Sequence, residues 1–330
     1  MKNEMILKTV NLYAFDGDLN TNVSTDSGLS AAFDNREFYS DYFIDLAGPE
    51  LVHDTFAQKH TLPENHGKYI AFRKYAPLPE ITTPLVEGVT PDGQKIEEST
   101  IEAEIKQYGG YATLSDVVTL TNPDKILIYR TELLADQGAR SLDVLTREVL
   151  VGGTNVRYAN GKSARSAVGE TDKLTVKDIK RAVRDLEAMN AKRFSDGYFG
   201  GIIHPYVAFD LTEDEQWRAP HQYVDTKEIY KYEIGAIAGV RFLQTSNAKK
   251  YAGGGASGAD VYATMVIGKD AYGTISLGGS GLEVITKPLG SGGTSDPLNQ
   301  RGTHGWKAFK ATKILVDEYM VRIESGASAD

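Results

Sequence analysis

The chain has 330 residues, 41% of them hydrophobic and 25% charged, which is ordinary for a globular protein large enough for two domains with sizeable cores. It contains no cysteine, which excludes disulfides, thiolate metal sites and cysteine nucleophiles. The formal net charge of −9 argues against a nucleic-acid binder, which would present a basic face to phosphates.

The first segments of the chain are poor in core-forming residues. Residues 8 to 35 are dominated by Asn, Asp, Ser, Thr and Gly, which indicates an arm or a disordered tail. The apolar run at the N-terminus is too short for a signal peptide, and no window approaches the ~20 apolar residues of a membrane span. An amphipathic pattern from Arg36 to Gln58, interrupted by Gly48-Pro49, predicts two short helices, and a turn follows from Pro63 to Gly67.

The next stretch, from Lys68 to Val118, predicts two strands joined by a long excursion. The outgoing run, Lys68 to Tyr75, is rich in aromatic and β-branched residues, and the returning run, Thr100 to Lys106, alternates apolar with charged residues. Between them, Ala76 to Ser99 carries four prolines, which exclude helix and favour an extended, stiff loop.

This excursion also carries apolar residues for which it has no core of its own. An isolated two-stranded ribbon is marginal in water, and loops of this length are uncommon in compact domains unless they are functional. We therefore infer that the apolar side chains are buried against another subunit. The residues alone leave open a second interpretation, a surface loop folded back on its own domain.

A long helix is expected after the hairpin. Asn122 is a suitable N-cap, Pro123 suits the first helical position, and Gly152-Gly153 ends the helix. One stripe is apolar and contains Leu127, Ile128, Leu134, Ala135, Leu142, Leu145 and Val149. The opposite side is charged and contains Asp136, Arg140, Asp143 and Arg147.

The remainder of the chain predicts an α+β arrangement. A turn is expected at Tyr158–Ser163, and a helix starts at Thr175, with Asp178 three residues later as in a capping box. Strands are expected at Tyr198–Phe209, Val240–Thr245, Val261–Ile267 and Leu282–Thr286, and a last β pair at Trp306–Leu315 and Tyr319–Glu324. The Gly-rich stretch Ala252–Gly258 indicates a flexible loop tip.

No catalytic, cofactor or metal site is predicted. Gly161-Lys162-Ser163 has the end of a phosphate-binding loop, but Val156 stands where the motif needs its first glycine, so a turn is the better interpretation. The six histidines form no helical pair or carboxylate cluster suited to zinc. Glu213-Asp214-Glu215 is interpreted as a solvated cap rather than a catalytic pair of acids.

Several pieces of the chain, in order, resemble the major capsid proteins of tailed double-stranded DNA phages, specifically the podovirus-type capsid family. These pieces are Arg73–Pro79, Thr83–Gly93, Ile203-His204-Pro205, Gly268–Gly273 and Asp296–Lys307. No single piece is a chemical signature, and the resemblance rests on their order and spacing over most of the chain from about Gly67 onward.

The resemblance implies an α+β tailed-phage capsid fold divided into six segments. These would be an N-terminal arm at 1–35, short helices at 36–67, an extended β-hairpin loop at 68–118, a peripheral domain with a long spine helix at 119–170, an axial domain at 171–288 and a return to the peripheral domain at 289–330. The loop would then reach over a neighbouring subunit in the shell.

The function implied is a structural subunit that assembles into hexamers and pentamers of an icosahedral head around double-stranded DNA, in the virion, after assembly in the host cytoplasm. Its partners would be other copies of itself, the portal, and scaffold or decoration proteins, with no membrane and no sequence-specific DNA binding. Contacts expected to be buried between subunits are Pro79, Ile81, Pro84, Leu85 and Val89. Charged residues expected to set register and orientation are Arg73, Lys74, Glu97, Glu98, Glu102 and Glu104.

Two alternatives remain open at this point. An encapsulin-like nanocompartment shell would share the fold and package enzymes. A hydrolase or nucleotide-binding enzyme built on the Gly-rich stretches belongs to a different class.

Overall fold

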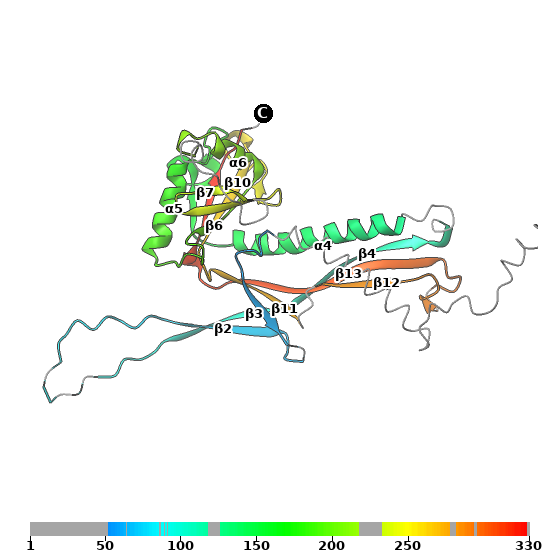
Figure 1. The fold of residues 1–330 in the computed structure, drawn as a ribbon, viewed down its shortest axis with the longest axis horizontal. Helices are drawn as coiled ribbons and strands as arrows, with labels where there is room; N and C mark the ends of the chain where they lie inside the picture. The colour runs from blue at the N-terminus through cyan, green and yellow to red at the C-terminus, as the bar shows by residue number, and fades with distance from the viewer. Residues whose placement is uncertain are drawn as a thin grey trace, which may run out of the picture. The chain divides into compact units, whose positions relative to one another are not determined.

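The computed structural model describes residues 52–63, 65–85, 87, 88, 90, 92–117, 126–217, 233–277, 282–293 and 296–328 (Figure 1). The chain divides into two compact units. The described residues of unit 1 fall within Tyr111–Ala135 and Val284–Trp306. Those of unit 2 fall within Ala47–Gly110, Asp136–Glu283 and Lys307–Asp330.

A seven-stranded sheet forms the centre of unit 2. Its strand order is β5-β14-β10-β6-β8-β7, and β9 also pairs with β10. β10 is buried at every position because its sequence, VYATMVI, is almost wholly apolar and both of its faces are covered. The strands are β5 Val156–Tyr158, β6 Phe199–Ile203, β7 Glu233–Ile237, β8 Val240–Gln244, β9 Lys250–Tyr251, β10 Val261–Ile267 and β14 Met320–Ser325.

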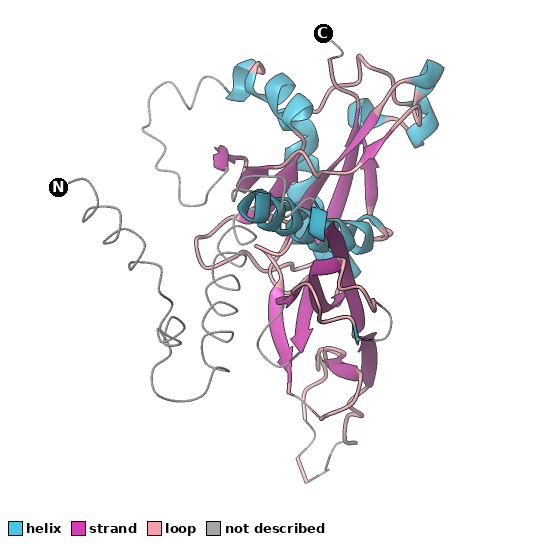
Figure 2. Ribbon diagram, turned by 90° about the vertical axis from the view of Figure 1, so that its right-hand side faces the viewer, coloured by secondary structure: helices cyan, strands magenta, loops and turns pink. Residues whose placement is uncertain are grey.

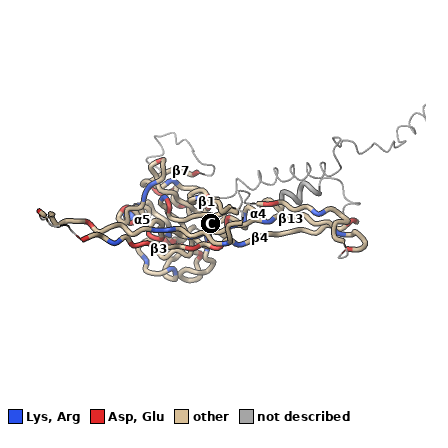
Figure 3. The backbone as a smooth tube through the Cα atoms, turned by 90° about the horizontal axis from the view of Figure 1, so that it is seen from below, with Lys and Arg blue, Asp and Glu red and all other residues tan. Residues whose placement is uncertain are grey.

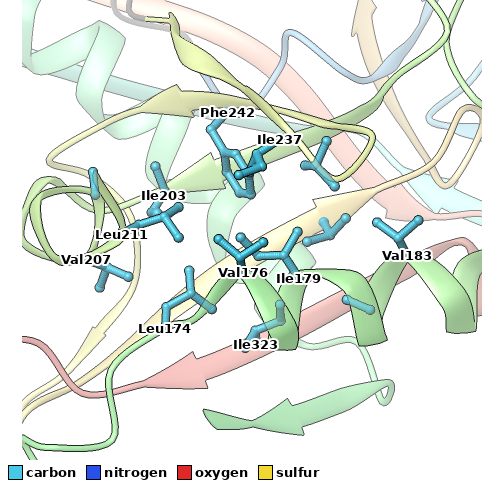
Figure 4. Packing of buried hydrophobic residues seen from close by; sticks show 14 of the residues in the cluster. Leu174, Val176, Ile179, Val183, Ile203, Val207, Leu211, Ile237, Phe242 and Ile323 are labelled. Atoms are coloured by element: carbon cyan, nitrogen blue, oxygen red, sulfur yellow. The ribbon is translucent and has the colours of Figure 1, made fainter. Parts of the chain in front are cut away.

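Two helices contribute to the main core beside this sheet, α5 (Val176–Ala188) and α6 (Pro205–Thr212). Thr175 caps α5 as the sequence predicts, since its side chain accepts a hydrogen bond from the backbone N–H of Asp178. Val176 and Ile179 of α5 point toward the strands in Figure 4 and are buried together with Phe242. Figure 2 shows both helices and strands among the described residues, in agreement with the α+β class expected from the sequence.

The long helix is α4, Ile126–Val151, and it ends at Gly152-Gly153 as predicted. Its expected N-cap, Asn122, lies outside the described residues. Ala135 and Leu142 of the apolar stripe are buried, but Asp143, expected on the exposed charged side, is completely buried as well. That prediction is wrong because Asp143 has buried hydrogen-bond partners from a distant segment.

A second sheet has the strand order β1-β11-β13-β12, and β4 also pairs with β13. β1 runs parallel to β11, and β11 runs antiparallel to β13. A third, two-stranded sheet is formed by β2 and β3. These strands are β1 Gln58–Leu62, β2 Tyr69–Tyr75, β3 Glu98–Glu104, β4 Lys106–Ser115, β11 Tyr272–Leu277, β12 Leu282–Lys287 and β13 Arg301–Ile314.

Other expectations need correction. Residues 52–57 form turns rather than the second short helix. The strand predicted at Tyr198–Phe209 ends at Ile203, because His204 caps α6 and Pro205 occupies its first turn. The last two strands do not pair with each other, since β13 and β14 belong to different sheets. The bounds of the six predicted segments remain predictions.

The Gly-rich stretch Ala252–Gly258 is packed more closely than the flexible loop tip that the sequence predicts. Gly255 donates its backbone N–H to Ala259 O, and Ala256 donates to Val168 O. A Cβ atom added at Gly255 would lie 2.3 Å from Val168 O, so the backbones approach as closely as they do only because this residue is glycine.

Candidate assembly surface

The predicted hairpin is present as an antiparallel ribbon of β2 and β3. Its register runs from the pair Tyr69↔Glu104 to the pair Tyr75↔Glu98. Beyond the strands, Ala76 N–H donates to Glu97 O over 3.0 Å, and the Gln94 side chain donates to Pro79 O over 3.2 Å. The two legs of the loop are therefore held together past the ends of the strands, as Figure 1 shows for the extended excursion after β2.

The base of the ribbon is attached to the core of unit 2. Ile70 and Phe72 of β2 are partly buried and pack against a cluster that contains Ile105 and Ile275. The ring of Phe72 also meets the His60 ring edge-on, with centroids 4.9 Å apart. Because side chains alternate along a strand, these inward-pointing residues determine which face of the ribbon packs against unit 2 at the base.

The apolar side chains of the excursion are exposed, in contrast. Leu78 is 51% exposed, Ile81 72%, Leu85 75% and Ile96 63%. Pro79 and Pro84 are exposed as well. Val89, also expected in the buried contact, lies outside the described residues. The alternative interpretation of the sequence required the loop to fold back on its own domain. The exposure of these side chains shows that the described part of the loop does not fold back on its own unit.

The charged residues of the ribbon divide into paired and unpaired groups. Arg73 Nε lies 3.2 Å from Glu98 Oε1 across the two strands, and Lys74 Nζ lies 3.8 Å from Glu318 Oε2. All four side chains are substantially exposed, so these ion pairs contribute little to stability. Among the described residues, no ion-pair partner accompanies Glu97, Glu102 or Glu104.

The ribbon is also acidic. Between Ala76 and Ser99, five acidic residues against one lysine leave a formal net charge of −4. Acidic positions, drawn red in Figure 3, recur along this part of the chain. An exposed surface that is both apolar and negatively charged is suited to a partner with apolar and basic side chains.

A buried polar network that the sequence did not reveal lies in unit 2 before β1. His53 Nδ1 and Asp143 Oδ2 are 2.8 Å apart, and His53 N–H donates to Asp143 Oδ1 over 2.9 Å. Asn247 donates its side-chain amide to Asp143 over 3.2 Å. Burial acts to raise the pKa of the Asp143 carboxyl, but hydrogen bonds and the charge interaction with His53 outweigh burial and leave that pKa below its usual value.

The neighbouring Asp54 extends this network to β13. Its carboxylate forms an ion pair with Lys310 and accepts a hydrogen bond from Thr146 Oγ1 over 2.7 Å. The Tyr272 hydroxyl donates to His53 O, and burial raises the pKa of this phenol well above its usual value. The segment that leads into β1 is therefore held to α4, β11 and β13 by hydrogen bonds and an ion pair. These contacts also stabilise the base of the ribbon, which packs beside β1.

The described residues offer little for catalysis. No group of three or more His, Cys, Asp or Glu side chains within them could hold a metal ion. Gly161-Lys162-Ser163 borders a cavity of about 400 Å³, but Lys162 Nζ lies 3.5 Å from Asp172, and Arg181, another lining residue, pairs with Asp178. No described helix is long and apolar enough to cross a membrane.

No protein-family model and no curated protein matches the chain. Solved structures do match. The capsid of Ralstonia phage GP4 shares 13% identity, with 84% of this chain and 88% of that chain covered and a TM-score of 0.68. The capsid of the cyanophage P-SCSP1u shares 14% identity, with 84% and 89% covered and a TM-score of 0.62.

The chain has the phage capsid fold. A match to the capsid of a native GTA particle, with 8% identity, 84% of this chain and 91% of that chain covered and a TM-score of 0.59, agrees with this assignment. The α+β capsid fold expected from the sequence is thereby confirmed. At such low identity, the shared property is the three-dimensional arrangement, and the residues of the loop are this chain's own.

Proposed function

We propose that the chain is the major capsid protein of a tailed double-stranded DNA phage. In this role it assembles into rings of five and six that close into an icosahedral head. The observation that supports this proposal most strongly is the exposed apolar loop between β2 and β3 in a chain with the phage capsid fold. In an isolated subunit, the exposed apolar side chains of this loop do not contribute to the stability of the fold. In a shell, each loop can bury these side chains against a neighbouring copy.

The loop acts in assembly by adding one contact per subunit. Leu85 and the other apolar residues of the loop are buried on a neighbouring copy, and the charged residues of β2 and β3 set the orientation of the ribbon. Head-to-tail contacts of this kind close into rings when the rotation between copies permits. Each contact is modest, but a subunit that is held at several points leaves the shell rarely, because the contacts reinforce one another.

The negative charge of the chain supports the role of a container for DNA. With a formal net charge of −9, the wall does not adhere strongly to enclosed phosphates. We propose no catalytic role, and the partners are other copies of this chain, the portal, and scaffold or decoration proteins. The virion is the place of action.

Electron microscopy of the purified protein tests this proposal. Negative-stain images are expected to show closed particles tens of nanometres across, or the rings from which they form. Particles that contain phage DNA after infection distinguish a head from a nanocompartment, whose cargo is protein. A protein that remains monomeric or a small oligomer under all assembly conditions would refute the proposal.

A further inference from the structure

The cavity of about 400 Å³ between β5, the turn that follows it and α5 lies within unit 2 and is lined mainly by basic and polar residues. Three of the described residues that line it, Arg157, Lys162 and Arg181, are basic, whereas only Asp178 is acidic. Pockets of about 300–1,000 Å³ commonly accept small organic ligands, so this cavity has room for more than a single inorganic ion. Its lining therefore favours an anionic small molecule.

We propose that this cavity binds a phosphate group, with Arg157, Lys162 and Arg181 as charged donors and the Ser163 hydroxyl as a neutral one. Nucleotides and inorganic phosphate share this chemistry, and the experiment below distinguishes them. Binding here involves no catalysis and does not depend on a role in a shell.

Lys162 is held only loosely by its acidic neighbour. Its Nζ lies 3.5 Å from the Asp172 carboxylate, which is longer than an ordinary hydrogen bond. Asp172 accepts hydrogen bonds from Gly169 N–H and from the Asn160 side-chain amide, each over 2.9 Å. Lys162 can therefore turn its ammonium group toward an anion in the cavity without leaving Asp172 unpaired.

The two arginines keep donors in reserve. Arg181 pairs with Asp178 through Nη1 over 3.0 Å. Arg157 pairs with Asp185 through Nε, and Asp185 has a second cation, Arg184, 3.0 Å away. Because a guanidinium group has five N–H donors, both lining arginines retain N–H groups with which to bind a ligand.

The turn that carries Lys162 and Ser163 is fixed by local structure. Asn160 and Gly161 both have left-handed backbone conformations, with φ angles of 54° and 71°, and Lys162 N–H donates to Ala159 O over 3.2 Å. Within the described part of the chain, the Ser163 hydroxyl has no hydrogen-bond partner. A preformed turn lowers the ordering cost of binding and leaves this hydroxyl available to a ligand.

Isothermal titration calorimetry of the full-length protein tests the site, with AMP, inorganic phosphate and adenosine as probes. AMP should bind saturably and less tightly at higher salt, whereas adenosine, which lacks the phosphate, should not bind. AMP that binds about tenfold more tightly than inorganic phosphate would identify a nucleotide site, and equal affinities would identify inorganic phosphate as the ligand. The absence of saturable binding by both phosphate probes, or equal binding of adenosine and AMP, would overturn the proposal.

Two variants test the assignment of the donors. Arg181→Gln and Lys162→Gln should each weaken binding about tenfold, because each removes a charge-assisted hydrogen bond. The two side chains are 37% and 38% exposed, so the thermal unfolding midpoint should change little. If one variant fails to fold, the other still tests the site. Wild-type affinity in a folded variant of either residue would contradict its role as a donor.

A matched control is Lys180→Gln. It removes the same charge from the position on α5 before Arg181, but Lys180 is exposed and does not line the cavity. This variant should bind AMP and phosphate as the wild type does. If it weakens binding as much as Arg181→Gln does, the attraction comes from general surface charge and the proposed site is wrong. Electron microscopy of the same preparations reports separately on assembly, so failure of this site and failure of the proposed function are distinguishable.

Discussion

Replacement of Leu85 by aspartate separates assembly from folding. In the subunit, Leu85 is 75% exposed, so the substitution removes almost no packing. Exposed substitutions away from caps and strained positions change the free energy of unfolding by about 0.5 kcal/mol or less. The thermal unfolding midpoint of the isolated subunit should therefore stay close to that of the wild type.

In the shell, the same substitution is costly. Burial of a leucine side chain contributes about 2 kcal/mol, which the variant loses at each loop contact. A loss of about 2 kcal/mol weakens the equilibrium constant of one contact roughly 30-fold. The buried carboxylate adds a desolvation penalty of several kcal/mol unless it finds a cation. Since every copy carries the change, closed shells should disappear.

The measurement pairs negative-stain microscopy of assembly reactions with thermal unfolding of the subunit. Met189→Asp serves as the control, because it adds the same charge at another exposed apolar side chain and should still assemble. Normal particles from Leu85→Asp would refute the burial of this residue between subunits. An unfolded variant would show instead that Leu85 supports its own subunit.

Three further predictions concern the fold. Because the pKa of Asp143 is depressed, its interactions stabilise the fold at neutral pH, and this contribution is lost as the pH falls below the ordinary value of 3.8. In acid titrations followed by circular dichroism, the stability of Asp143→Asn should therefore depend less steeply on pH over that range. Gly255→Ala should lower the free energy of unfolding by about 3 kcal/mol in denaturant titrations because of the clash with Val168 O, whereas Gly93→Ala, with no atom within 4 Å of the added Cβ, should be nearly neutral. Thr175→Ala should cost about 1 kcal/mol in the same assay through loss of the α5 cap, and Thr175→Ser should retain most of that stability.

Local signals in the sequence were sufficient for elements that depend on local chemistry. The ribbon followed from alternation in Thr100–Lys106 and from the prolines between the strands, and the α5 cap followed from Thr175 and Asp178. The extended, stiff loop follows from its prolines, whereas the sequence leaves open whether the loop folds back on its own domain, and the exposure of Leu78, Ile81 and Leu85 decides against this. Whether the loop is buried on another copy remains a prediction.

Elements that depend on distant partners were not predictable in this way. Asp143 has the helical position of a surface charge, and only its contacts with His53 and Asn247 make burial favourable. The sequence of β14 alternates like an ordinary final strand, but nothing local shows that it pairs with β5 and β10. The apolar run predicts that the strand continues through His204-Pro205, but His204 caps α6 and Pro205 begins it, because proline favours the start of a helix.

The position of β14 has a consequence for the timing of production in the cell. This strand lies between β5 and β10, so the central sheet is interrupted until Met320–Ser325 have left the ribosome. Pairing over such a long separation along the chain is also slow. A nascent subunit therefore cannot complete its central sheet until translation has passed this point, so the finished fold of unit 2 forms only late in synthesis.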